Sequence, residues 1–272
     1  MATTSAVMKP QNLKPRVAVL LGVIAVALIA LAFVKRIPQD PAYHNFADRR
    51  ELWGVPNALN VLSNVPFFFV GLAGLWVIVR RRGELLNREE LYPYVALFAG
   101  VMLVTFGSGY YHLNPNNATL LWDRLPMAVA FMGLMSGLVA ERVSVRWGVR
   151  LLPLLVALGA ASVLYWYWSE LVGRGDLRPY GVVQFLPMLL IPMLIWMFPP
   201  RYTGAGWYFG VYGLYAVAKV LELFDAEVFH ALHSVSGHSL KHCAAAASIG
   251  CLLVMVWRRK PWPVLSVSQG HY

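Results

Sequence analysis

Three histidines in this chain have the type and the spacing of metal ligands. His238 and His242 are four residues apart, so on one helix both imidazoles project from the same face and can share an ion. Zinc in catalytic sites takes three protein ligands and keeps one position for water, and His112 is the natural third ligand. The histidine pair alone is a weak signal, and it gains specificity from the polar residues that accompany it.

Two of these polar residues lie close to His112 in the sequence. Asp123 follows it by eleven residues, across a tight turn, so its carboxylate can reach a metal-bound water or a ligand histidine. Ser108 lies four residues before His112, which turns its hydroxyl toward the same space, and the adjoining Tyr111 is a further candidate to contact a ligand or the substrate. Asp123 is the only carboxylate in this set and is therefore the expected general base.

Other interpretations of the histidines stay open at this point. Facing helices can supply two axial histidines to a haem, although a haem gives Asp123 and Ser108 no role. A lone histidine at a membrane surface is usually hydrogen-bonded to water or to lipid headgroups, and we interpret the four remaining histidines in this way: His44, His230, His233 and His271.

The elements that must hold these residues are membrane helices. Of the 272 residues, 58% are hydrophobic and only 13% are charged, whereas a soluble domain has about 25% charged residues. This composition cannot cover a soluble globule with polar side chains, and it also excludes disordered, collagen-like and disulfide-scaffold proteins. Cys243 and Cys251 lie eight residues apart in one apolar segment and therefore indicate no redox compartment.

Eight apolar stretches have about the 20 residues that a membrane-spanning helix needs: 17–34, 58–80, 91–112, 121–140, 148–168, 180–198, 204–224 and 238–257. They predict an all-α membrane bundle, with a seven-helix core that encloses the metal site and one extra N-terminal helix. A signal peptide is the alternative for the first stretch, but its apolar run of 18 residues exceeds the usual 7–15. Lys35 and Arg36, directly after it, also make a poor cleavage site. We divide the chain into 1–40 (tail and extra helix), 41–260 (seven-helix core) and 261–272 (tail).

The basic residues predict the orientation of these helices. Fourteen Lys and Arg residues fall in the segments on the side of both termini and six on the other side. Because cytoplasmic segments carry the excess of Lys and Arg, both termini are expected in the cytoplasm. The metal site then lies toward the periplasmic or lumenal face. The net charge of +10 has the same explanation, and no basic face with interleaved aromatic residues indicates nucleic-acid binding.

Two further polar clusters lie in or beside the apolar stretches. Lys219, Glu222 and Asp225 are spaced three apart, so Lys219 and Glu222 can pair on one helix face. The two carboxylates could orient a ligand histidine through hydrogen bonds, and a purely structural ion pair is an equal alternative.

The second cluster opens the stretch 58–80. It contains Asp48, Asn57, Asn60, Ser63 and Asn64, and its three asparagines fall on one helical stripe that must face the bundle interior. Packing between helices is the favoured interpretation of this stripe.

The motifs resemble those of the alkaline ceramidases, which belong to a superfamily of seven-helix membrane hydrolases that includes the adiponectin receptors. The resemblance covers about residues 44–257, in the family's order and on the corresponding helices. It rests on Gly107-Ser108-x3-His112, on Asp123 with Leu125-Pro126-Met127, on His238-x3-His242, and on Asn60-Val61-Leu62-Ser63-Asn64. Trp122-Asp123-Arg124 and Ser236-Gly237-His238 are more similar to the bacterial branch, which favours a bacterial inner membrane over a eukaryotic secretory membrane.

The resemblance implies a zinc-dependent amidase that cleaves a lipid such as ceramide by attack of zinc-bound water. Carried over residue by residue, the three histidines bind zinc, Asp123 acts on the zinc-bound water, and Ser108 holds the substrate carbonyl or its oxyanion. The expected partners are the lipid bilayer and a ceramide-like N-acyl lipid. The oligomeric state is not indicated.

The resemblance is weaker for a second metal. Eukaryotic members of the family also bind calcium through an acidic N-terminal loop, and Asp48 matches that loop. Asn57, however, stands where those ceramidases carry a glutamate. Calcium prefers several carboxylates among its ligands, so calcium binding is doubtful.

Two alternatives come from other functional classes. A receptor-like lipid-binding protein would retain the zinc site with little turnover, and the sequence is compatible with it. A transporter could use Lys219, Glu222 and Asp225 as a path for charge, but this leaves the histidine cluster unexplained.

Overall fold

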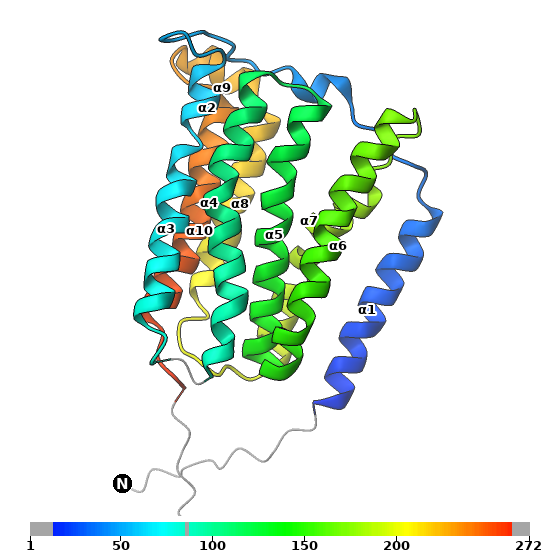
Figure 1. Ribbon diagram of the computed structural model, residues 1–272, viewed down its shortest axis with the longest axis vertical. Coiled ribbons are helices and arrows are strands. Elements are labelled where there is room, and N and C mark those ends of the chain that lie inside the picture. Colours follow the sequence, from blue (N-terminus) through cyan, green and yellow to red (C-terminus); the bar gives the residue numbers. More distant parts are fainter. Residues whose placement is uncertain (1–12, 85–86, 263–272) are drawn as a thin grey trace, which may run out of the picture.

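The computed structural model describes residues 13–84 and 87–262, and this part of the chain is helical without a strand (Figure 1). Residues 1–12 of the predicted N-terminal segment 1–40 and residues 263–272 of the predicted tail 261–272, with His271, lie outside the described residues. In chain order the elements are α1 (Lys14–Phe33), η1 (Pro41–His44), α2 (Ala58–Leu62), α3 (Val65–Arg80), η2 (Arg88–Glu90), α4 (Leu91–Leu113), α5 (Asn117–Arg142), α6 (Val145–Leu171), α7 (Arg178–Met197), α8 (Trp207–Leu223), α9 (Asp225–Leu232) and α10 (Gly237–Arg258).

The predicted all-α membrane bundle is confirmed. Within the described ranges, seven helical segments are long and apolar enough to cross a membrane: α1, α2 with α3, η2 with α4, α5, α6, α7 and α10. The eighth predicted stretch, 204–224, forms α8, whose 17 residues are at the lower limit for crossing a bilayer. The chain is a multi-pass membrane protein.

Helices α3 to α8 and α10 pack together into the core, and α1 lies outside it (Figure 1). Helix α4 packs between α3 and α5, α5 packs on α6 and α7, and α10 packs on α8 and α3. Helix α1 packs against α7 and buries only Leu20 of its apolar surface. The loop that follows α1 is held by Arg178, whose Nη1 donates to the carbonyl of Val34 at 2.6 Å. The position of α1 agrees with an extra N-terminal helix.

Small residues bring α4 and α5 into close contact. A Cβ atom at Gly107 would overlap the main-chain oxygen of Trp122, and one at Gly100 would lie 2.8 Å from the amide nitrogen of Ala130. Within a bilayer no hydrophobic effect drives helices together, because lipid is as apolar as the helix surfaces. Membrane helices therefore associate through such small residues, which let their main chains pack closely. The close approach places the end of α4 against the start of α5, where Ser108 and the candidate general base lie.

The turn between these two helices is fixed by a capping box. The side chain of Asn116 accepts hydrogen bonds from the main-chain N–H groups of Ala118 and Thr119, and the Thr119 hydroxyl accepts one from the main-chain N–H of Asn116. These bonds satisfy orphan donors at the start of α5. The turn is therefore short and rigid, and it sets the first turn of α5 beside the last turn of α4.

Gly107→Ala should lower the melting temperature of the detergent-purified protein. The added methyl group meets main chain rather than a side chain that can move, and overpacking of this kind costs about 1–3 kcal/mol. Gly213→Ala on α8 is the matched control, because a Cβ there meets nothing within 4 Å. Equal melting temperatures for Gly107→Ala and the wild type would contradict the close contact of α4 with α5.

Candidate metal centre

The three predicted ligand histidines meet at the end of the bundle that also holds α9. His112 lies in the last turn of α4, and His238 and His242 lie in the first two turns of α10. Their ring centroids are 4.8–5.0 Å apart, and one nitrogen of each ring lies within 4.8 Å of the others. All three side chains are buried. This group could hold a metal ion.

The hydrogen bonds of the three rings favour a metal at their centre. Nδ1 of His112 and Nε2 of His238 are buried and have no hydrogen-bond partner among the described residues. Ser63 Oγ lies 2.8 Å from Nδ1 of His242, which leaves Nε2 of that ring for an ion. A buried polar atom without a partner costs about 1–3 kcal/mol. A metal ion would remove this cost for His112 and His238 and could also bind Nε2 of His242, so the three residues fit a metal ion that takes imidazole ligands.

The same geometry disfavours a haem between two histidines. The three rings are in mutual contact, and centroid distances of 4.8–5.0 Å leave no gap for a porphyrin between any two of them. A bis-histidine haem needs two rings on opposite sides of a flat macrocycle.

An aromatic ring covers the histidines. Phe46, in the loop after η1, has its ring centroid 4.7 Å from that of His112 and 4.4 Å from that of His238. Its side chain is 5% exposed. No local pattern indicates this contact, because it joins a loop to helices that are far away in the chain. Phe46 separates the candidate metal centre from the surface.

The predicted general base lies beside the histidines. Asp123, in the second turn of α5, and Ser108, near the end of α4, line the same cavity as His112, His238 and His242. The Ser108 hydroxyl interacts with the Asp123 carboxylate. A carboxylate, a hydroxyl and three imidazoles therefore face one space, which is the arrangement that hydrolysis assisted by a metal requires.

The main chain around the histidines is held by polar side chains. Asp225 Oδ1 accepts from the main-chain N–H of His238 at 2.7 Å, and its Oδ2 accepts from the N–H of Ala47 at 2.9 Å. Asp225 thus accepts its hydrogen bond from the main-chain amide of His238, and not from the imidazole as expected from the sequence. The reason is that α8 ends at Leu223 and Asp225 opens α9, so Asp225 no longer follows the helical spacing of Lys219 and Glu222.

The three asparagines of the predicted stripe lie at the same end of the bundle, but Asn57 precedes α2 with a left-handed main chain (φ 48°), so the three do not form one helical stripe. Asn57 Nδ2 donates to the carbonyl of His112 at 2.9 Å. Asn60 accepts from the Ser239 hydroxyl at 2.8 Å and donates to the carbonyl of Asp48 at 3.0 Å. Asn64 Nδ2 instead donates to the carbonyl of Asn60 on its own chain segment. Two of the three asparagines therefore connect α2 to the helices that carry the histidines.

Tyr111 and His44 form a second support for His112. The Tyr111 ring centroid lies 4.9 Å from that of His112, and its hydroxyl is 2.9 Å from Nδ1 of His44. Nε2 of His44 is 3.0 Å from Oδ1 of Asn117. The interpretation of His44 as a surface histidine bonded to water or lipid is therefore wrong, because both of its ring nitrogens contact protein side chains.

Lys219 and Glu222 on α8 form a cluster with Lys241 of α10, which the sequence spacing did not indicate. Glu222 Oε2 is 2.7 Å from Nζ of Lys219, and its Oε1 is 2.6 Å from Nζ of Lys241. Lys241 lies on the same helix turn as the two ligand histidines of α10. The pairing across helices could not be read from α8 alone.

The carboxylate of Asp48, in the loop compared above with a calcium loop, is bound by a guanidinium group. Both oxygens of Asp48 accept hydrogen bonds from Arg50, at 2.8 and 2.7 Å. Arg50 also donates to the carbonyl of Ser234 at 2.7 Å. These bonds join the loop before α2 to the loop before α10. They also hold the pKa of the Asp48 carboxyl below its ordinary value.

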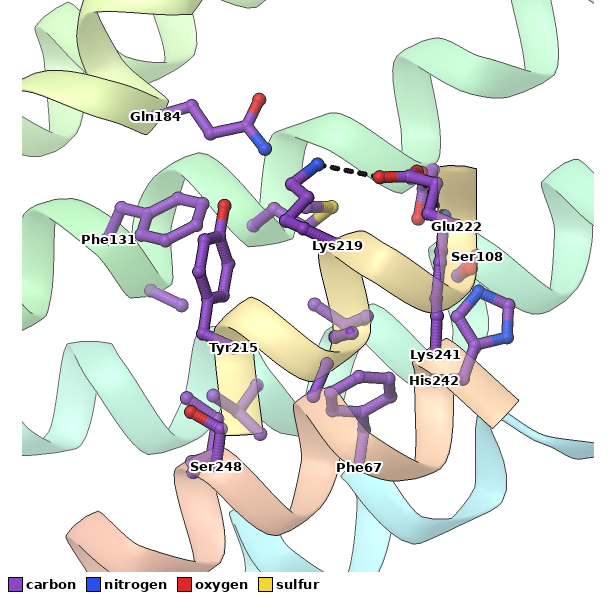
Figure 2. Close-up of a pocket in the computed structure, with 18 of the residues that line it drawn as sticks. Phe67, Ser108, Phe131, Gln184, Tyr215, Lys219, Glu222, Lys241, His242 and Ser248 are labelled. Carbon is purple, nitrogen blue, oxygen red and sulfur yellow. Dashed lines mark hydrogen bonds and ion pairs between the residues drawn. The ribbon is translucent and has the colours of Figure 1, made fainter. Parts of the chain in front are cut away.

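A cavity of about 340 Å³ extends from the histidines into the bundle (Figure 2). Its polar end contains the residues described above, and its other walls are mostly apolar side chains of α3, α4, α5, α7, α8 and α10. On α10 the lining residues run from His238 to Leu252, a rise of about 21 Å at 1.5 Å per residue. Pockets of roughly 300–1,000 Å³ hold small ligands, and this one has the length for an extended acyl chain.

Comparison with protein families identifies one match. The family model described as Ceramidase matches residues 54–197, just over half of the chain. This chain belongs to the ceramidase family. The match spans α2 to α7 and includes Ser108, His112 and Asp123, and it ends before α10, which carries the other two histidines. Comparison with curated proteins and with solved structures finds no match.

Stability should fall in acid through the Asp48–Arg50 pair. Because the pKa of Asp48 is lowered in the folded protein, the pair stabilises the fold above the ordinary aspartate pKa of about 3.9. This contribution is lost as the pH drops through the lowered pKa. Asp48→Asn should therefore have a lower melting temperature than the wild type at pH 6, with the difference shrinking toward pH 3.

The control for this experiment is Asp40→Asn, which removes a carboxylate that contacts the Ala42 amide rather than a guanidinium. A difference between wild type and Asp48→Asn that is the same at pH 6 and pH 3 would show that the ion pair does not stabilise the fold.

Proposed function

We propose that this protein is a zinc-dependent membrane amidohydrolase that cleaves the N-acyl amide bond of a lipid such as ceramide. The proposal rests mainly on one observation: three buried imidazoles, Asp123 and Ser108 line the same end of a long cavity. Membership of the ceramidase family supports an amide bond as the target. Three imidazole ligands and an open position are the ligand set of catalytic zinc.

The residues around the centre divide the chemistry among them. His112, His238 and His242 would hold the ion, which when bound supplies Lewis acidity, polarising a carbonyl and activating water at neutral pH. The carboxylate of Asp123 takes the proton of the attacking water as the C–O bond forms. The same carboxylate then gives this proton to the amine nitrogen as the C–N bond breaks.

Ser108 and Phe46 assist this reaction in different ways. The Ser108 hydroxyl, next to Asp123, donates a hydrogen bond to the substrate carbonyl or to the oxyanion that develops from it. Phe46 packs on the two histidine rings and keeps bulk water from the metal ligands. The reaction therefore takes place away from bulk water, where these interactions are stronger than in water.

The cavity accounts for a lipid substrate. Its apolar walls along α4 and α10 accept the acyl chain, and its length of about 21 Å compares with a hydrocarbon thickness of about 30 Å. The acyl chain then lies parallel to the helices, with its carbonyl carbon at the histidine end. The domain division into an extra helix at 1–40, a hydrolase core at 41–260 and a tail at 261–272 is part of this proposal.

The charge distribution supports an orientation with both termini in the cytoplasm. The end of the bundle opposite the histidines is rich in arginine, including the run Arg80-Arg81-Arg82 and the pair Arg258-Arg259. Arg and Lys mark cytoplasmic ends of membrane helices. The histidine centre then faces the periplasm or lumen, and the bacterial inner membrane is the proposed location.

Asp123→Asn should retain zinc and lose about 10²–10⁴-fold in lipid amide hydrolysis, because the amide side chain cannot take up a proton. The assay measures release of fatty acid from ceramide by the detergent-purified protein, with the zinc content determined on the same sample. Glu89→Gln removes an exposed carboxylate at the opposite end of the bundle and serves as the control. A wild-type protein that holds zinc and hydrolyses no N-acyl lipid would contradict the enzyme and favour a receptor-like protein.

A further inference from the structure

The cavity wall beside the histidines carries more positive than negative charge. The lining residues include three cationic side chains, Arg124, Lys219 and Lys241, and two carboxylates, Asp123 and Glu222. Glu222 uses one oxygen on each lysine, while each ammonium group has three N–H donors. A zinc ion would add two further positive charges. Unbalanced charge within a membrane bundle is costly and therefore indicates a function.

The same wall has hydrogen-bond donors without acceptors. The buried hydroxyl oxygen of Tyr215 has no partner among the described residues, and neither has Nη1 of Arg124, a side chain that is only 6% exposed. Figure 2 shows the Tyr215 hydroxyl, the Lys219 ammonium and the Gln184 amide pointing toward the same part of the cavity. A ligand that satisfies this wall must bring acceptors and negative charge.

The two lysines lie to the side of the metal centre rather than along the acyl chain. Lys219 is four residues from the end of α8 and Lys241 four residues after the start of α10. The two helices run in opposite directions and their ends meet beside α9 (Figure 1). Both lysines therefore lie at the depth of the ligand histidines. The apolar part of the cavity extends away from this level toward the opposite end of the bundle.

The cavity reaches the surface next to these donors. Phe185 lines it and is 54% exposed, and the Lys219 side chain, also in the lining, is 39% exposed. Nζ of Lys219 lies 6.0 Å from the centroid of the Phe185 ring. A lipid whose acyl chain occupies the apolar part and whose carbonyl lies at the histidines must place its amine half between the metal centre and this opening.

We propose that Lys219, Lys241 and Tyr215 form a subsite for an anionic group, a carboxylate or a phosphate, on the amine half of the lipid substrate. This inference rests on the proposed amidohydrolase function and narrows its substrate class to N-acyl lipids with an anionic headgroup. Glu222 positions the two ammonium groups and leaves the remaining N–H donors of each for the substrate. The anion also balances the charge of the wall.

Two pairs of lipids test the subsite on the zinc-loaded protein in a neutral detergent. Each pair shares its acyl chain and differs in the charge of the amine half: N-palmitoylglycine against N-palmitoylethanolamine, and ceramide 1-phosphate against ceramide. Because hydrogen bonds to charged groups are stronger than those between neutral groups, kcat/KM should be about tenfold or more higher for the anionic member of at least one pair. A preference within the first pair indicates a carboxylate, and a preference within the second pair indicates a phosphate. Lys219→Met should lower this anionic-to-neutral ratio about 10- to 100-fold, Tyr215→Phe should lower it less, and Lys219→Arg should restore most of it.

The matched control is Lys35→Met, which removes an exposed lysine outside the cavity and should leave the ratio unchanged. Equal kcat/KM values within both pairs, or an unchanged ratio in Lys219→Met, would overturn the subsite while the proposed hydrolysis stands.

A binding measurement separates the subsite from the enzyme function. Hexadecyl phosphate should raise the melting temperature of the wild type more than hexadecanol, and Lys219→Met should abolish the difference. If this holds in a protein that hydrolyses no lipid, the proposed function fails and the anion subsite stands. If phosphatidylglycerol in mixed micelles removes the preference for anionic substrates, the lysines bind bilayer lipid and the proposed role in substrate selection is wrong.

Discussion

Polar groups buried in a membrane bundle must find partners within the protein, and this requirement governs the end of the molecule where the histidines meet. Nδ1 of His112 and Nε2 of His238 have no partner among the described side chains, and the third ring is bonded on one side by Ser63. An ion at their centre satisfies all three. The packing of both α4 and α10 against α2 and α3 brings the ligands within reach of one another, and the close packing of α4 on α5 places Asp123 beside them.

The surrounding polar residues act mainly on the main chain. Asn57 holds the carbonyl of His112, Asp225 holds the amide of His238, and Asn60 holds Ser239. Each bond joins a histidine segment to another element, so the ligands are fixed before an ion binds. A metal site needs preorganisation of this kind, because the supporting residues orient the side chains that bind the metal. The Asp48–Arg50 pair adds a tie between two loops at the same end.

Local patterns in the sequence predicted most of this molecule. Hydrophobic length predicted the helices, and the four-residue spacing of His238 and His242, with polar residues at one depth, predicted the cluster. Contacts between distant segments could not be predicted in this way. Phe46 covers the rings from a loop, and Lys241 pairs across helices with Glu222; both depend on how the helices are rotated against one another. The three-residue spacing places Asp225 on the same helix as Lys219 and Glu222, although α8 ends two residues before Asp225.

The central claim is that the three histidines hold the metal on which the activity depends. Its most direct test is the metal content of the detergent-purified protein, by mass spectrometry, for the wild type and for the double variant His238→Ala/His242→Ala. We expect about one zinc ion per wild-type chain and a loss of most of it in the folded double variant, because catalytic zinc needs three protein ligands. Purification without chelators that yields no zinc in the wild type, or equal zinc in both proteins, would contradict it.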